Sequence, residues 1–210
     1  MSERLVYVMD PMCSWCWGFA PVVEALAAQA REHGVALDLV VGGLRQESTP
    51  ISHSSREKIL THWQAVAQTT GQPFTFADAL ADGFIYDTTL ACQALVAART
   101  VNPALVLVYA RVLQEAFYIH QAPMNRARDL VLLAEECGLD ASALAQALDD
   151  PLTLRQTRQD FAWAERLGVV GFPTLLAERK GQLALLTNGY QPLTALAPLL
   201  TRWLAQAARA

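Results

Sequence analysis

Two cysteines near the start of the chain have the spacing of a redox pair. Cys13 and Cys16 enclose Ser14 and Trp15 in the sequence Cys-Ser-Trp-Cys. A thiol exchanges with a disulfide only as its thiolate, and the free N–H groups at a helix N-terminus stabilise that charge. If a helix begins here, Cys13 is the attacking thiol, and Cys16 lies one turn later, where it resolves the mixed disulfide. We therefore assign catalysis to these two cysteines.

The two residues between the cysteines are candidates for substrate binding. The Ser14 hydroxyl is suited to donate a hydrogen bond to the Cys13 thiolate, which would stabilise the reduced pair. We expect Trp15 to lie on the surface as an apolar platform for substrates, with core packing as the alternative.

The same cysteine spacing also occurs in zinc half-sites, which need two further ligands. The remaining cysteines, Cys92 and Cys137, stand alone in segments of helical pattern, and the four histidines show no clustered spacing. We therefore expect no metal site. Cys92 is interpreted first as a small apolar helix residue and second as a third redox thiol.

Asp10 lies three residues before Cys13 and has two interpretations. A carboxylate at this position forms a turn or caps the helix that follows. Alternatively, it relays protons for Cys16. We favour the turn or cap.

The cysteine pair lies between a predicted strand and a predicted helix. Residues 5–9 form a short apolar run that favours a buried strand, and residues 16–31 carry apolar side chains at helical spacing. Residues 35–41 predict a second strand, which ends at the pair Gly42-Gly43. A cysteine pair at a strand–helix junction in such a β-α-β pattern is typical of thioredoxin-like redox proteins.

The end of the chain supplies the rest of such a sheet. Residues 174–178 and 183–187 predict two strands joined by the turn at residues 179–181, and residues 193–208 predict a final helix. Between the two ends, the apolar spacing is helical, apart from a loop expected over residues 72–86. The expected helices cover residues 54–69, 88–100, 104–119, 126–137, 141–148 and 152–167.

These patterns predict an α/β protein with a thioredoxin-like fold and an inserted all-helical domain. We expect the thioredoxin-like domain to comprise residues 1–50 and 168–210. The helical insertion would comprise residues 51–167. The two domains would form one discontinuous unit.

A second motif, Gly171-Phe172-Pro173-Thr174, precedes the first strand of the predicted hairpin. Proline is accepted at the first position of a strand, so it would simply mark the strand's start. The alternative is a cis Phe172–Pro173 bond that faces Cys13, with the Phe172 backbone N–H and C=O offered to an extended substrate. Composition alone favours the first interpretation.

Composition limits the partners of the protein. The 210 residues are 53% hydrophobic and carry a formal net charge of −4, without a basic stripe for nucleic acid. No apolar run reaches the length of a membrane span, and no signal-peptide pattern follows Met1. We expect a cytoplasmic monomer or dimer that binds neither nucleic acid nor membranes.

The stretch from Met9 to Phe19 resembles the DsbA-like branch of the thioredoxin superfamily, and in particular the FrnE-like predicted protein-disulfide isomerases. Similar stretches follow in the same order at residues 42–44, 88–92, 116–118 and 168–174. The resemblance implies a thioredoxin fold with an inserted helical domain, and it makes Pro173 the family's cis-proline. Periplasmic DsbA proteins carry proline and histidine between their cysteines, so the direction of their reaction is not transferred to this chain. We expect a reductase or isomerase that the cytosolic pool keeps reduced.

Three classes of function fit these features. The first is a thiol–disulfide oxidoreductase or isomerase that acts on protein or small-molecule disulfides, with no cofactor beyond its own disulfide and with glutathione as a candidate reductant. The second is a glutathione-dependent kappa-class transferase or 2-hydroxychromene-2-carboxylate isomerase. Such enzymes typically carry serine in place of Cys13 and lack a resolving cysteine. The third is a non-catalytic binding or chaperone module. The complete cysteine pair favours the first class.

Overall fold

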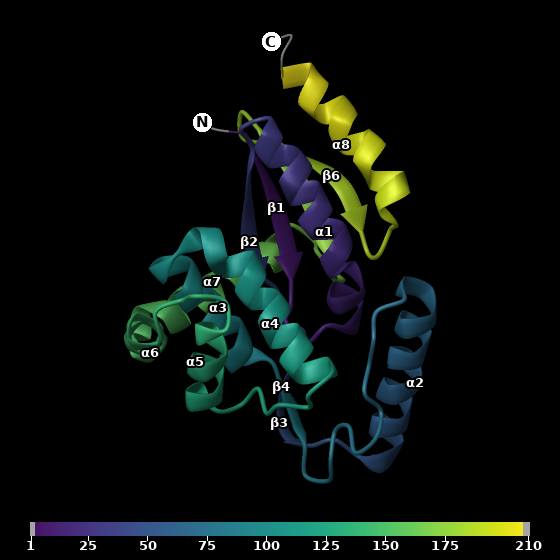
Figure 1. Cartoon of the computed structure of the whole chain (residues 1–210), viewed down its shortest axis with the longest axis vertical. Helices are drawn as coiled ribbons and strands as arrows, with labels where there is room; N and C mark the ends of the chain where they lie inside the picture. The colour runs from purple at the N-terminus through teal and green to yellow at the C-terminus, as the bar shows by residue number, and fades with distance from the viewer. Residues whose placement is uncertain (1–2, 208–210) are drawn as a thin grey trace.

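The computed structural model describes residues 3–207, in which one mixed sheet lies at the centre (Figure 1). Within these residues the sheet has four strands in the order β2-β1-β5-β6, namely β1 (Arg4–Met9), β2 (Ala36–Val41), β5 (Thr174–Arg179) and β6 (Gln182–Asn188). β1 pairs in parallel with β2 and antiparallel with β5. The two ends of the chain therefore build one sheet. No helix in the described part combines the length and apolarity that a membrane crossing requires.

The central strand β1 is buried on both faces, and alternation along the strand decides which residue faces which layer. The odd-numbered residues 5, 7 and 9 belong to the main core, which includes the first helix, α1 (Ser14–Glu32). Val6 and Val8 pack on the opposite face against Ala164. That alanine belongs to helix α7 (Pro151–Arg166). The last helix, α8 (Leu193–Ala207), contacts α1 and β6.

The segment between β2 and β5 is mainly helical, as the apolar spacing predicts. Besides α7 it contains α2 (His53–Thr70), α3 (Thr89–Val101), the short 3-10 helix Pro103–Leu105, α4 (Val106–Tyr118), α5 (Ala127–Glu135) and α6 (Ala141–Asp149). Figure 1 shows α2 apart from the group formed by α3, α4, α5 and α6. The predicted thioredoxin-like fold with an inserted helical domain is confirmed.

The predicted loop over residues 72–86 is wrong at its end. Residues Ile85–Asp87 form a strand, β4, which pairs antiparallel with β3 (Gln46–Pro50) in a second, two-stranded sheet. Neither strand was predicted, because every residue of β3 is exposed and its sequence Gln-Glu-Ser-Thr-Pro has no apolar alternation.

The predicted last helix extends to residue 208, which lies outside the described residues. Residues 1, 2, 209 and 210 of the expected domain bounds lie outside them as well.

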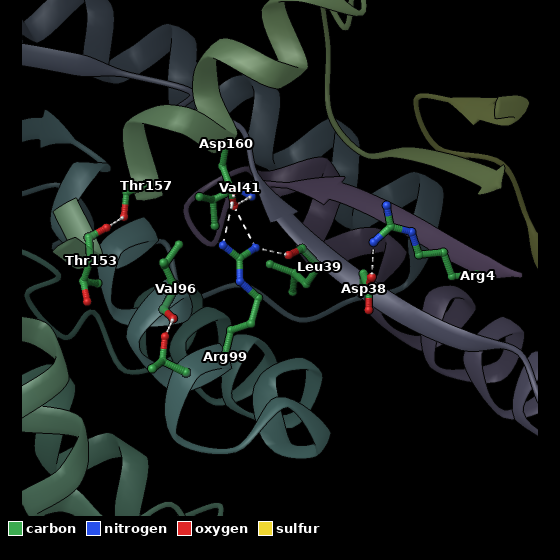
Figure 2. A network of polar contacts seen from close by, with 10 residues as sticks. Arg4, Asp38, Leu39, Val41, Val96, Arg99, Thr153, Thr157 and Asp160 are labelled. Atoms are coloured by element: carbon green, nitrogen blue, oxygen red, sulfur yellow. Dashed lines mark hydrogen bonds and ion pairs between the residues drawn. The ribbon is translucent and has the colours of Figure 1, made fainter. Parts of the chain in front are cut away.

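An ion pair from the helical segment caps the outer edge of β2 (Figure 2). Arg99 of α3 donates to the Leu39 carbonyl at 2.8 Å and to Asp160 of α7 at 2.9 Å. The same carboxylate accepts the Val41 N–H at 3.2 Å. Backbone groups at a sheet edge need such partners when no further strand pairs with them. The pair therefore joins α3 and α7 to the sheet.

Candidate functional site

The two cysteines of the motif lie at the start of α1, directly after the turn that follows β1. Cys13 is the residue that precedes the helix, and its backbone is extended, with φ −89° and ψ 116°. Its carbonyl accepts the Trp17 N–H at 3.1 Å, which places the first turn of the helix directly after it. The Cys13 side chain is 5% exposed, whereas that of Cys16 is fully buried. Both cysteines are free thiols in this structure.

The loop before β5 brings a backbone carbonyl to the first cysteine. The Cys13 thiol donates to the Phe172 carbonyl, with 3.6 Å between sulfur and oxygen, and the Phe172–Pro173 peptide bond is cis. Two further contacts fix the loop. The Thr174 hydroxyl donates to the Gly171 carbonyl at 2.9 Å, and the Pro173 carbonyl accepts the Gly189 N–H at 2.7 Å.

The Phe172 side chain fills space that a glycine leaves open at the end of β2. A Cβ atom built on Gly42 would lie 2.0 Å from the Phe172 Cζ atom. The absence of a side chain at Gly42 therefore lets the ring pack directly on the backbone. This contact couples the loop before β5 to the segment that follows β2.

Burial makes the second cysteine a poor acid. Loss of hydration raises the pKa of Cys16 well above its usual value, and the hydrogen bond and charge of Cys13 raise it further. Cys16 is therefore a neutral thiol at neutral pH. Its sulfur becomes a nucleophile only when a neighbouring group stabilises the charge.

The fully buried carboxylate of Asp10 accepts four hydrogen bonds. Oδ1 accepts the Met12 N–H at 2.8 Å, which forms the turn before α1. Oδ2 accepts the Leu44 N–H at 2.7 Å, the Thr88 hydroxyl at 2.6 Å and the Cys92 thiol at 3.4 Å. Burial raises the pKa of Asp10, and the hydrogen bonds act in the opposite direction. Asp10 thus joins the cysteine turn to the start of α3.

A cavity of about 400 Å³ opens beside Cys13 and is walled by α2. Its ionisable lining includes three basic side chains, those of Arg45, Lys58 and His62, and no carboxylate of the described residues lines it. The Trp15 ring packs against His62 with 5.8 Å between ring centroids. The wall of the cavity beside Cys13 is therefore basic, although the whole chain has a net charge of −4.

A family model described as the DSBA-like thioredoxin domain matches residues 4–201 of this sequence. The chain belongs to that family. The family resemblance predicted from the motif between Met9 and Phe19 is thereby confirmed.

Two solved structures are similar to this DsbA-like chain over nearly their whole length. A candidate protein disulfide isomerase from Nitrosomonas europaea is 37% identical, with a TM-score of 0.92, over 98% of this chain and 99% of that one. The cytosolic disulfide reductase DsbM from Pseudomonas aeruginosa is 30% identical, with a TM-score of 0.80, over 95% and 98%. DsbM has also been solved with GSH.

A curated relative of the DsbA-like chain is more distant. The ClpXP adapter protein SpxH of Halalkalibacterium halodurans is 23% identical over 172 residues, which are 80% of this chain. The match spans 56% of the length of SpxH.

The structure places most of the residues chosen from the sequence around one cavity of this DsbA-like fold. Cys13, Ser14, Trp15 and Phe172 line it. Cys16 and Pro173 are both buried and do not line the cavity. Ser14 is buried as well, and Trp15 is half-buried rather than a free surface platform, because rings pack on it.

Sequence reasoning missed the basic wall of the cavity. Arg45 follows β2, whereas Lys58 and His62 lie on α2, so only the folded chain brings them to the cysteine pair. The spacing of Lys58 and His62, four residues apart, predicts one helix face. Nothing in the sequence indicates what that face meets. No group of three or more metal-ligating side chains occurs within residues 3–207.

Proposed function

We propose that this protein is a thiol–disulfide oxidoreductase that reduces or isomerises disulfides through Cys13 and Cys16. One observation carries the proposal. The Cys13 thiol lies at the N-terminus of a 19-residue helix, lines an open cavity and contacts the Phe172 carbonyl. A helix N-terminus favours the thiolate, and the cavity gives it access to a disulfide. The family and its cytosolic reductase relative support this function.

The reaction proceeds by two exchanges of thiol and disulfide. The Cys13 thiolate attacks one sulfur of the substrate, the substrate disulfide breaks, and the other substrate sulfur leaves as a thiolate. The Phe172 backbone aligns the bound substrate beside Cys13. Cys16 then attacks the Cys13 sulfur, which releases the second substrate thiol and leaves the Cys13–Cys16 disulfide. Two glutathione molecules return the pair to the dithiol and become glutathione disulfide.

The basic wall of the cavity favours substrates that carry carboxylates. A tripeptide such as glutathione has two carboxylates, and a cavity of about 400 Å³ lies within the usual size range of small-molecule sites. Lys58 and Arg45 are placed to meet those charges. We therefore propose glutathione or its mixed disulfides as a ligand, in agreement with the solved complex of DsbM with GSH. The cytosol, where glutathione is reduced, is the proposed compartment.

The first test is the reduction potential of the cysteine pair. The protein is equilibrated in glutathione buffers of graded ratio, and the fraction of Cys13–Cys16 disulfide is measured by alkylation and mass spectrometry. A potential near that of thioredoxin, about −270 mV, supports a reductase or isomerase. A value near about −120 mV would make the protein an oxidant. Failure to form a reversible disulfide would refute the proposal.

A second test traps the intermediate. In the Cys16→Ala variant the resolving thiol is missing, so Cys13 should retain one glutathione after exposure to glutathione disulfide. The Cys13→Ala variant is the matched control and should retain none, provided that both variants also carry Cys137→Ser to remove the partly exposed thiol. If Cys16→Ala traps nothing and keeps full turnover, the assignment is wrong, and the glutathione-dependent transferase or isomerase class is favoured instead.

A further inference from the structure

The buried Tyr7 hydroxyl forms no hydrogen bond of regular geometry in the dithiol form, and it lies near the sulfur of Cys16. Among the described residues, three buried side-chain polar atoms have no partner, and the Tyr7 hydroxyl is one of them. Buried tyrosine hydroxyls normally find a partner, so an unpaired one needs an explanation. The other two atoms belong to Gln114 and Tyr118, both of α4.

The position of Tyr7 follows from the alternation along β1. Tyr7 is an odd-numbered residue of the strand and therefore faces α1. Its ring packs on that of Phe19, with 6.0 Å between centroids. Phe19 lies three residues after Cys16, on the same face of α1. Tyr7 and Cys16 consequently share one buried compartment between the sheet and the helix, in which both are at most 1% exposed.

The charges around the Tyr7 hydroxyl come from the cysteine pair. Burial raises the pKa of Tyr7 well above its usual value, and the negative charge that either cysteine carries as a thiolate, together with the hydrogen bond between Tyr7 and Cys16, raises it further. The phenol therefore keeps its proton at neutral pH, and it acts toward sulfur as a donor rather than as a base. The other ionisable groups that face Cys16 are Asp10, Cys13 and Tyr118.

We propose that the Tyr7 hydroxyl donates a hydrogen bond to the Cys16 sulfur while Cys16 attacks the mixed disulfide on Cys13. This inference rests on the proposed function. In the step, a bond forms between the two cysteine sulfurs, and the bond from Cys13 to the substrate sulfur breaks. The electron pair leaves with the substrate thiolate, which takes up a proton in place of the one that Cys16 released. The hydrogen bond from Tyr7 compensates for part of the free energy that the buried thiolate loses by being out of water.

The weak contact between the Tyr7 hydroxyl and Cys16 in the dithiol form agrees with this role. A neutral thiol is a weak acceptor, whereas a thiolate accepts strongly, so the hydrogen bond is strongest when the charge develops on Cys16. A donor whose hydrogen bond strengthens as that charge develops stabilises the transition state more than the resting state. The Tyr118 hydroxyl differs, because after burial it is the charge of Tyr86, and not that of a cysteine, that raises its pKa most.

The test compares Tyr7→Phe with Tyr109→Phe. Tyr109 is equally buried, but its hydroxyl donates to the Leu130 carbonyl at 2.7 Å, away from the cysteines. Both changes are made in the full chain with Cys137→Ser, because Cys137 is the partly exposed thiol outside the pair. Reduced protein is mixed with Ellman's reagent in a stopped-flow instrument. Attack by Cys13 releases the first thionitrobenzoate, and attack by Cys16 releases the second.

We expect Tyr7→Phe to slow the second phase about tenfold or more, because a hydrogen bond to a charged group is lost. The pH midpoint of that phase should rise, the first phase should stay within about twofold of the parent, and the thermal stability of the dithiol form should not fall. The proposal is overturned if the second phase matches that of Tyr109→Phe. It is also overturned if Tyr7→Phe unfolds the protein or slows both phases equally. Absence of a second phase in the parent would instead refute the proposed function.

Discussion

The contact between Gly42 and the Phe172 ring makes a sharp prediction for Gly42→Ala. The new Cβ atom would lie 2.0 Å from one ring carbon and 2.1 Å from another. Carbon atoms approach comfortably to about 3.5–4.0 Å, so the ring must retreat by roughly 1.5–2 Å. Phe172 cannot retreat freely, because its carbonyl accepts the Cys13 thiol and the Pro173 carbonyl next to it accepts the Gly189 N–H.

The magnitude follows from the size of that displacement. Overpacking of this kind costs about 1–3 kcal/mol of unfolding free energy. For a chain of this length, the melting temperature should fall by roughly 2–12 °C. If the backbone of Phe172 moves with its ring, kcat/KM for a disulfide should fall by up to about 100-fold, because the substrate is misaligned with Cys13.

The assay combines thermal unfolding of the dithiol form with turnover of glutathione disulfide, for which dithiothreitol rather than glutathione is the reductant. Gly171→Ala is the matched control, since it lies beside Phe172 but its Cβ atom would meet only the Asn188 side chain at an ordinary 3.8 Å. This control should keep both its stability and its activity. The reasoning is refuted if Gly42→Ala melts at the temperature of the parent and turns over substrate at the same rate.

Three further predictions concern charged groups. Burial raises the pKa of Asp10, so the folded protein binds that proton more tightly, and lowering the pH through the folded pKa should stabilise the parent relative to Asp10→Asn. Urea unfolding at graded pH would show no such trend if Asp10 stays unperturbed. Arg99→Met should cost about 1–3 kcal/mol in urea unfolding, because Asp160 and the Leu39 carbonyl lose a donor; an unchanged midpoint would contradict the edge cap. With dithiothreitol as the reductant, Lys58→Glu should raise KM for glutathione disulfide about threefold to tenfold and spare uncharged hydroxyethyl disulfide. An equal effect on both disulfides would argue against charge recognition.

The parts of the fold that depend on local pattern were predictable from the sequence. The apolar run before Cys13 and the helical spacing after it define β1 and α1, because both signals lie within about twenty residues. The helices after residue 52 were found in the same way. By contrast, β3 has no apolar alternation, and its pairing with β4 joins Gln46 to Asp87 and Pro50 to Ile85, which are 41 and 35 positions apart. No local signal marks such a strand.

In the candidate site, too, the residues that belong to local motifs were predictable, and those brought together by long-range contacts were not. The cysteine pair and Pro173 belong to recognisable motifs, so they can be predicted from the sequence. The hydrogen bonds of Asp10 with Thr88 and Cys92 join residues 78 and 82 positions apart. Lys58 and Cys13 line the same cavity only because α2 folds back against the start of α1. The unpaired hydroxyl of Tyr7 has no sequence signature, because a tyrosine in a buried strand is ordinary. Only the environment of its oxygen makes it unusual.

The position of β1 in the middle of the sheet has a consequence for synthesis on the ribosome. One neighbour of β1, the strand β2, ends at Val41, but the other neighbour, β5, begins only at Thr174. At about 5–20 residues per second, the ribosome needs roughly 10–30 s to supply that strand. During this interval the nascent chain presents an unpaired strand edge, and Cys13 lacks the Phe172 backbone that lies 159 residues downstream. The cysteine pair is therefore synthesised before the Phe172 backbone that contacts Cys13 in the folded protein. A chain released before β5 would contain both cysteines but would lack the Phe172 side of the proposed substrate site.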